Sequence, residues 1–316
     1  MSKRIIFFGT PPFAVKCLEK IIEEKFNIVA VVTAQDRPAG RGRQIRTSAV
    51  KDFAQARNLP VLQPSNLKNP EFTEKLSELK PDLMVVVAFR MLPKAVWSIP
   101  PRGTFNLHAS LLPEYRGAAP INWAIINREK YSGVTTFYIN EEIDTGAILL
   151  QEKVVVEEQD TAGSLHDKLA AKWSELICKT IKRIFESSIS PQKQETKGTE
   201  KVAPKLNKEN VFIHWDQPLE VIHAKIKGLS PYPGARSNWI EDQKVAVIKI
   251  FEAEILKEKH NFATNQVIIK DKKILIAHPS GFLNCKILQF PNKKQMSAID
   301  LLNGSSFSNK LEVSWA

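Results

Sequence analysis

Apolar residues follow two alternating patterns along the first 190 residues of this chain. Continuous apolar runs, typical of strands buried on both faces of a parallel sheet, cover residues 4–8, 28–33 and 82–89. Apolar residues at the spacing of helices cover 13–24, 48–58, 70–80 and 161–186. Further strand-like runs cover 103–110, 133–139 and 147–156. This alternation predicts an α/β fold with a Rossmann-like, doubly wound and mostly parallel sheet.

The pattern changes after residue 187. Residues 187–210 are polar and lack sustained periodicity, as expected of a surface linker. A helix-like stretch at 218–227 comes next, and it is followed by short strand-like runs at 246–253, 266–269, 274–277 and 283–288. Short strands separated by turn sequences predict a smaller, OB-like β-barrel. We therefore expect a first domain at 1–188, a linker at 189–208 and a second domain at 209–316.

Composition narrows the class of protein. Hydrophobic residues make up 43% of the 316 residues and charged residues 25%, which is typical of a globular protein. No apolar run approaches the roughly 20 residues that cross a bilayer, and no signal-peptide core precedes the first strand, so we expect a cytoplasmic protein without a membrane partner. The three cysteines, far apart in apolar segments, predict core positions, and no metal-ligand spacing occurs.

Charge indicates a polyanionic partner. The chain has 45 basic and 34 acidic residues, a net charge of +11. Residues 34–51 hold five basic residues against Asp36 alone, namely Arg37, Arg41, Arg43, Arg46 and Lys51. A merely lysine-rich background is the alternative explanation of the overall excess.

Candidate chemistry lies on one expected strand and one later turn. Strand side chains alternate between faces, so Phe105 and Leu107 are expected to face the core while Asn106 and His108 point together to the other side. An amide, an imidazole and the Asp144 carboxylate can together bind an oxyanion and move a proton. Residues 144–146 also fit a plain turn. The Gly9 turn lacks a dinucleotide fingerprint, which disfavours a nicotinamide dehydrogenase.

Several blocks of the sequence together resemble a known family. The blocks lie at residues 8–11, 36–43, 106–113, 115–120, 144–146 and 203–206. They are similar to those of the methionyl-tRNA formyltransferases, within the wider class of formyltransferases that use 10-formyltetrahydrofolate. The residues at 88–93 depart from the family pattern, being one residue shorter and without its glycine, and Glu142 and Ala147 stand where glycine and a carboxylate are common.

The resemblance implies a reaction and its site. The α-amino group of methionine on initiator tRNA would attack the formyl carbon of the folate, giving N-formylmethionyl-tRNA for translation initiation. Asn106, His108 and Asp144 would be catalytic. The folate would be held by Ser110, Leu111, Leu112, Pro113, Phe89 and Arg90, and the tRNA by Arg37, Arg41, Arg43 and Arg46. No metal and no obligate protein partner are implied, and a monomer is expected.

Two other functions remain open at this point. A formyltransferase acting on an amino-sugar nucleotide would share the folate domain, although it has no need of the arginine-rich segment. A catalytically silent RNA-binding protein on the same fold would keep the basic surface, but it would not need Asn106, His108 and Asp144 together.

Overall fold

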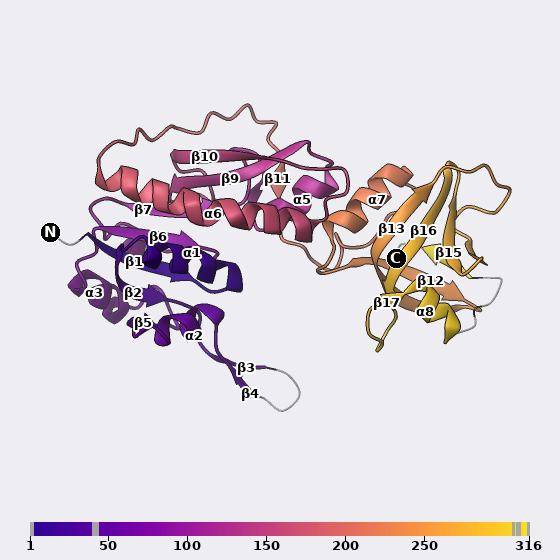
Figure 1. Ribbon diagram of the computed structural model, residues 1–316, viewed down its shortest axis with the longest axis horizontal. Coiled ribbons are helices and arrows are strands. Elements are labelled where there is room, and N and C mark those ends of the chain that lie inside the picture. The colour runs from indigo at the N-terminus through magenta and orange to yellow at the C-terminus, as the bar shows by residue number, and fades with distance from the viewer. Residues whose placement is uncertain (1–2, 40–43, 305–306, 308–310, 315–316) are drawn as a thin grey trace. The chain divides into compact units, whose positions relative to one another are not determined.

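The computed structural model describes residues 3–39, 44–304, 307 and 311–314, and its chain separates into two compact units (Figure 1). The first unit comprises residues 1–117, 132–154 and 167–202, and the second comprises 118–131, 155–166 and 203–316. The units are thus interleaved along the sequence, and the continuous ranges expected above stay a prediction. Within the described ranges, no helix is both long enough and apolar enough to cross a membrane.

A seven-stranded sheet forms the centre of the first unit, in the order β10-β9-β7-β6-β1-β2-β5. Its strands are β1 (Arg4–Gly9), β2 (Asn27–Val32), β5 (Val61–Leu62), β6 (Leu83–Val87), β7 (Thr104–His108), β9 (Tyr131–Tyr138) and β10 (Ile148–Val155). The β1–β2, β1–β6, β2–β5 and β6–β7 pairs are parallel, while β7 and β9 are antiparallel. The predicted Rossmann-like, mostly parallel sheet is confirmed.

Helices cover this sheet because its central strands are apolar on both faces. All five residues of β6 are buried. The helices of the unit are α1 (Pro12–Glu23), α2 (Ala49–Gln55), α3 (Pro70–Glu78), α4 (Lys94–Trp97) and, from residue 167 on, α6 (Ala162–Phe185). Ile6 and Phe8 of β1 share a core cluster with Phe72 of α3, whereas Phe13 of α1 packs against Trp173 of α6 with ring centroids 4.7 Å apart. The cysteines are free and buried, as predicted.

The order of the strands along the sheet reverses direction at β1. β1 lies between β6 on one side and β2 on the other, so the connections after β1 and after β6 leave in opposite directions. Ligands of open α/β sheets bind outside the carboxyl ends of the strands at such a reversal. The loop that follows β6 and contains Phe89 and Arg90 starts at this point.

The second unit is built on an antiparallel sheet. Its strands are β12 (Ala235–Glu241), β13 (Lys244–Leu256), β14 (Val267–Lys270), β15 (Lys273–His278), β16 (Gly281–Gln289), β17 (Met296–Ser297) and β18 (Glu312–Ser314). The strands follow the order β14-β15-β16-β13-β12-β18, and the sheet curls round on itself. The Val267 amide donates to Leu311 O and the Val313 amide donates to Asn265 O, each at 2.9 Å. Its first and last strands thus meet, which confirms the predicted barrel-like domain.

The described residues of the second unit include the helices α5 (Pro120–Ile126), α7 (Leu219–Gly228) and α8 (Ala298–Asn303). The short strands β8 (Arg116–Gly117) and β11 (Val202–Ala203) pair with each other. α5 packs against α7, where the Asn122 side-chain amide donates to Gly228 O at 2.7 Å. A side chain at Gly228 would meet Ile126 Cγ1 at 2.5 Å, so this close approach requires glycine.

The arginine-rich segment begins and ends as an antiparallel ribbon rather than as a plain loop. β3 (Arg37–Ala39) pairs with β4 (Gln44–Arg46), and Arg37 lies opposite Arg46 in the register. Figure 1 shows this ribbon extending away from the sheet of the first unit. Three-residue strands are too short to produce a periodic signal, which is why the sequence did not predict them.

Candidate active site

β7 sorts its side chains as the alternation predicted. Phe105 and Leu107 are buried on one face, while Asn106 on the other face keeps partial exposure. His108 shares the face of Asn106 and is only 6% exposed. Asn106 lies opposite Val86 of β6 and Phe137 of β9, so its backbone is fixed in the middle of the sheet.

Both ring nitrogens of His108 face oxygen atoms. Nε2 lies 2.8 Å from the carbonyl oxygen of Tyr115, and Nδ1 lies 3.6 Å from Asp144 Oδ2. Phe137 adds an edge-to-face contact, with ring centroids 6.5 Å apart. A carbonyl and a carboxylate can only accept hydrogen bonds, so a hydrogen bond at either contact has the ring nitrogen as its donor.

The turn that carries Asp144 is shaped by its own residues. Asp144 has φ +55°, a left-handed conformation in which Asp and Asn are enriched. Its Oδ2 accepts a hydrogen bond of 2.9 Å from the Gly117 amide. Gly146 passes so close to Tyr138 that an added Cβ would lie 1.6 Å from the Tyr138 carbonyl oxygen. Residues 144–146 therefore aim a carboxylate at His108, and the plain-turn alternative does not explain that contact.

The segment from Ser110 to Pro113 is held by internal hydrogen bonds. Ser110 Oγ donates to Glu114 O at 2.6 Å, and Ser110 O accepts from Thr135 Oγ1 at 2.6 Å. The Leu112 amide donates to Thr135 Oγ1, while Leu112 O accepts from the Gln151 side chain. Polar groups of Ser110 and Leu112 are thus already paired, which leaves the half-buried Leu111 and Pro113 as the accessible parts of this segment.

Phe89 and Arg90 follow β6 at the reversal of strand order. Phe89 packs edge-to-face on Phe8 at 5.6 Å between centroids, and the Arg90 guanidinium carbon lies 5.7 Å from the Phe89 ring centroid. Arg90 donates to the carbonyls of Ser65 and Pro64. Burial lowers the pKa of Arg90, and the charge of Arg37 adds to this. The charge of Arg37, at the base of the ribbon, is therefore close enough to act on Arg90 in the loop after β6.

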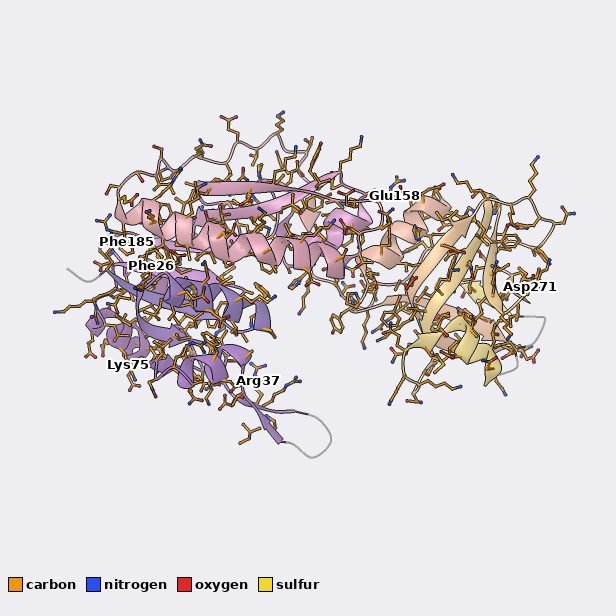
Figure 2. All side chains as sticks on the ribbon, in the orientation of Figure 1. Phe26, Arg37, Lys75, Glu158, Phe185 and Asp271 are labelled. Atoms are coloured by element: carbon orange, nitrogen blue, oxygen red, sulfur yellow. The ribbon has the colours of Figure 1, made fainter. Side chains whose placement is uncertain are left out.

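Of the four arginines predicted to bind tRNA, the structure describes two. Arg37 and Arg46 lie opposite each other on the ribbon and are exposed, and Figure 2 labels Arg37 there. Arg41 and Arg43 lie outside the described residues. Like charges directly opposite on paired strands repel, so the Arg37–Arg46 pair costs stability unless an anion lies between them.

The base of the ribbon is anchored by Asp36. Its carboxylate binds Lys51 Nζ of α2 and accepts a hydrogen bond of 2.8 Å from the Gln63 side chain, which also donates to Ala34 O. The Lys51 ammonium and, second, the Gln63 amide hold the pKa of Asp36 below its usual value. This cluster fixes where the ribbon leaves the sheet.

We predict that Asp36→Asn lowers the melting temperature at pH 7 and that its deficit disappears in acid. A depressed carboxyl pKa stabilises the fold above the unfolded value of about 4, and this contribution is lost as the pH falls through the folded-state pKa. Thermal unfolding of both proteins between pH 7 and pH 2 measures the deficit. A deficit in melting temperature of constant size over that range would contradict a stabilising role of the ionised Asp36 carboxylate.

Within the described parts of the chain, no group of three or more His, Cys, Asp or Glu side chains is arranged to hold a metal ion. His223 Nε2 contacts Ala253 O and His260 Nε2 contacts His278 O, and both histidines belong to the second unit.

The expected linker is only partly a surface segment. Gln194 is 6% exposed, and its side-chain amide donates to the carbonyls of Asp144 and Gly146, each at 2.8 Å. Its Oε1 accepts from Arg116 Nε at 3.0 Å. Sequence reasoning missed Gln194 and Arg116 as site residues, because a single amide in a polar run carries no periodic signal.

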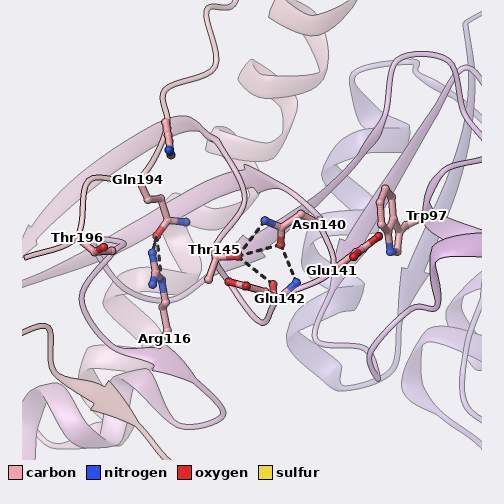
Figure 3. A pocket seen from close by; sticks show the side chains of 9 residues that line it. Trp97, Arg116, Asn140, Glu141, Glu142, Thr145, Gln194 and Thr196 are labelled. Carbon is pink, nitrogen blue, oxygen red and sulfur yellow. Dashed lines mark hydrogen bonds between the residues drawn. The ribbon is translucent and has the colours of Figure 1, made fainter. Parts of the chain in front are cut away.

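A cavity of about 590 Å³ opens beside this cluster (Figure 3). Its lining includes Trp97, Arg116, Asn140, Glu142, Thr145 and Gln194. Figure 3 shows Arg116 facing Gln194 on one side, and Asn140 and Thr145 hydrogen-bonded to each other within the loop that carries Asp144. The cavity therefore borders the outer side of the loop that supplies the carboxylate.

Comparison with known proteins identifies the class. The family model described as "Formyl transferase" matches residues 3–181, and "Formyl transferase, C-terminal domain" matches residues 205–306. The chain belongs to the formyl transferase family.

The relatives narrow the likeness further. The methionyl-tRNA formyltransferase of Flavobacterium johnsoniae is 49% identical over 310 residues, 98% of each chain. That of Bacteroides thetaiotaomicron is 45% identical over 311 residues, 97% of each chain. Among solved structures, an N-formyltransferase from Helicobacter canadensis, in complex with folinic acid and dTDP-3-aminofucose, matches with a TM-score of 0.67 and 23% identity, covering 92% of this chain and all of that one. This last likeness shows the fold alone.

Proposed function

We propose that this protein transfers the formyl group of 10-formyltetrahydrofolate to the α-amino group of methionyl-initiator tRNA. The choice of substrate is supported by the likeness to a protein named methionyl-tRNA formyltransferase, which is 49% identical over nearly the whole chain. The contact of His108 with Asp144 supports the chemistry. The product is N-formylmethionyl-tRNA, the initiator of translation.

In the proposed reaction, the amine attacks the formyl carbon and a tetrahedral oxyanion forms. The bond between that carbon and the folate nitrogen N10 then breaks, and the proton lost by the amine passes to N10. The Asn106 amide donates a hydrogen bond to the oxyanion. His108 donates a second one from Nε2, which exchanges its contact with Tyr115 O for the substrate, while Nδ1 stays beside Asp144. Each such donor is worth about 3 kcal/mol. His108 carries the proton. Asp144 orients its ring through Nδ1.

The folate site proposed here lies at the reversal of strand order. Phe89 offers an aromatic surface, and Arg90 a cation suited to the carboxylates of the folate's glutamate. Leu111 and Pro113 offer apolar contact, since the hydrogen-bonding groups of Ser110 and Leu112 named above are paired inside the protein. Ser110 and Leu112 would thus shape the pocket wall.

The arginine ribbon is proposed to bind the tRNA. Arg37 and Arg46 face each other across β3 and β4, where a phosphate would relieve their mutual repulsion. Arg41 and Arg43 belong to the same proposal from sequence. The fixed base at Asp36 gives the ribbon a defined direction.

We predict that Arg46→Ala raises the KM for tRNA about fivefold to tenfold and leaves the KM for the folate unchanged. The reason is the loss of one phosphate contact, which should also reduce the slope of log KM against log salt by about one. Because Arg37 loses a like-charged neighbour, the melting temperature should not fall.

Steady-state kinetics at several salt concentrations measure these effects. Arg57→Ala is the matched control, because Arg57 of the same unit pairs with Glu19 and stacks on Phe53. A change in folate KM alone, or equal effects of the two variants, would contradict the role of the ribbon.

We further propose that the protein acts in the cytoplasm as a monomer without an obligate protein partner, since initiator tRNA and folate are its substrates there. Gel filtration with light scattering tests the oligomeric state.

Parallel assays with two acceptors test the proposed function. With 10-formyltetrahydrofolate as donor, kcat/KM for methionyl-tRNA should exceed that for a dTDP-linked amino sugar by at least about 1,000-fold. The reverse preference would establish the amino-sugar alternative, and turnover of neither acceptor would support a silent RNA-binding protein.

A further inference from the structure

The segment 189–202 is hydrogen-bonded to other parts of the first unit at two places beside the catalytic residues. Ile148 and Gln192 exchange two backbone hydrogen bonds, of 2.7 and 2.8 Å, directly after the turn that carries Asp144. Farther along, Lys201 O accepts a hydrogen bond of 2.6 Å from the amide of Tyr115, whose own carbonyl contacts His108. This segment thus contacts the chain next to both partners of the His108 ring, Tyr115 and Asp144.

Gln194 lies between these two contacts, and both the nitrogen and the oxygen of its side chain are hydrogen-bonded to residues of the site. Its side-chain amide nitrogen donates to Asp144 O and Gly146 O, and its oxygen accepts from the Arg116 guanidinium (Figure 3). The side chain is buried, so water does not compete for these bonds. Two carbonyls two residues apart are therefore held by one amide group.

The contacts fix Asp144 from two directions. Gln194 holds its backbone, while the Gly117 amide holds its carboxylate at 2.9 Å. Arg116, which orients Gln194, is the residue directly before Gly117. A misplacement of about 1 Å at a reacting group can cost on the order of 100-fold in rate. The distance from Asp144 to His108 depends on this arrangement.

We propose that Gln194 is a positioning residue for formyl transfer: it holds the left-handed turn of Asp144 so that the carboxylate meets His108 Nδ1. The segment between the two domains of the family thereby becomes part of the active-site support. The kinetic part of this inference rests on the proposed function, but the structural part does not.

Three variants test the proposal. Gln194→Ala removes the whole contact. Gln194→Glu keeps the shape and an oxygen for Arg116, but it has no N–H for the two carbonyls. Gln192→Ala is the matched control, because its side chain is exposed and its contacts with Ile148 are made by the backbone.

Both Gln194 variants should lower kcat about 10-fold to 100-fold while the KM values for tRNA and folate stay within twofold. Gln192→Ala should match the unaltered protein. As a readout independent of activity, hydrogen exchange of the Gly117 amide should accelerate at least tenfold in both Gln194 variants only, because this amide donates to Asp144.

Normal kcat in Gln194→Glu would overturn the proposal, since the donated hydrogen bonds would then be dispensable. A general loss of amide protection across the first unit in both Gln194 variants would also overturn it, because the role would be structural. If the unaltered protein formylates no methionyl-tRNA, the proposed function fails, while the Gly117 exchange rates still decide whether Gln194 holds Asp144.

Discussion

His108→Ala is expected to lower kcat by about 1,000-fold to 10,000-fold while the affinity for methionyl-tRNA changes by less than twofold. The variant loses both an oxyanion donor and the proton carrier, and these effects are commonly worth 100-fold or more each. The ring is buried between Tyr115 O and Asp144, so it contributes little surface for a macromolecular substrate.

Single-turnover formylation and a separate tRNA-binding titration measure the two quantities. His278→Ala in the second unit, whose ring contacts Ser280 Oγ and Gln217 O, serves as the control and should retain normal turnover. Equal losses of turnover and tRNA affinity in His108→Ala would reduce His108 to a structural residue.

The second large effect is expected from Asp144→Asn, with kcat about 1,000-fold lower. Asparagine keeps an oxygen for the Gly117 amide and the backbone carbonyl for Gln194, so the turn should persist. What is lost is the negative charge 3.6 Å from His108 Nδ1, which orients the ring. In a comparable carboxylate–imidazole pair, this exchange costs about 10,000-fold.

The measurement is single-turnover kinetics together with the melting temperature. Asp52→Asn, an exposed change on α2, controls for the loss of one acidic residue and should stay within twofold. If Asp144→Asn kept more than a tenth of normal kcat, the carboxylate would not be part of the catalytic group.

The sequence predicted those elements whose residues form long patterns. The apolar run at 82–89 became β6, and the helical stripe at 161–186 became α6, each within a few residues. β12 was missed because inward-facing Ser237 interrupts its apolar alternation, although that hydroxyl is buried and accepts from the Trp215 indole. α5 was missed because its seven residues hold fewer than two helical turns of pattern.

In the candidate site too, the sequence predicted the residues that belong to a regular pattern and missed a residue placed by tertiary contacts. Asn106 and His108 were predicted to share a face because a strand has a fixed period of two. The approach of Asp144 depends on a folded turn, which no periodicity predicts. The sequence offered Asp144 as a candidate beside a plain turn, and the resemblance to a family gave it a role. Gln194 was hidden because two of its partners are backbone carbonyls and the third, Arg116, lies 78 residues away, and no sequence pattern records such contacts. Contacts between distant loops are set by tertiary packing.

The most direct test of the central claim follows the formyl group itself. Purified protein is mixed with 10-formyltetrahydrofolate labelled with ¹⁴C in its formyl group and with methionyl-initiator tRNA, and the amino acid is then released from the tRNA and chromatographed. We predict that the label appears in N-formylmethionine, approaches one formyl group per tRNA, and is absent when His108→Ala is used over the same time. Unlabelled methionine after complete incubation, with transfer to an amino-sugar nucleotide under the same conditions, would contradict the account.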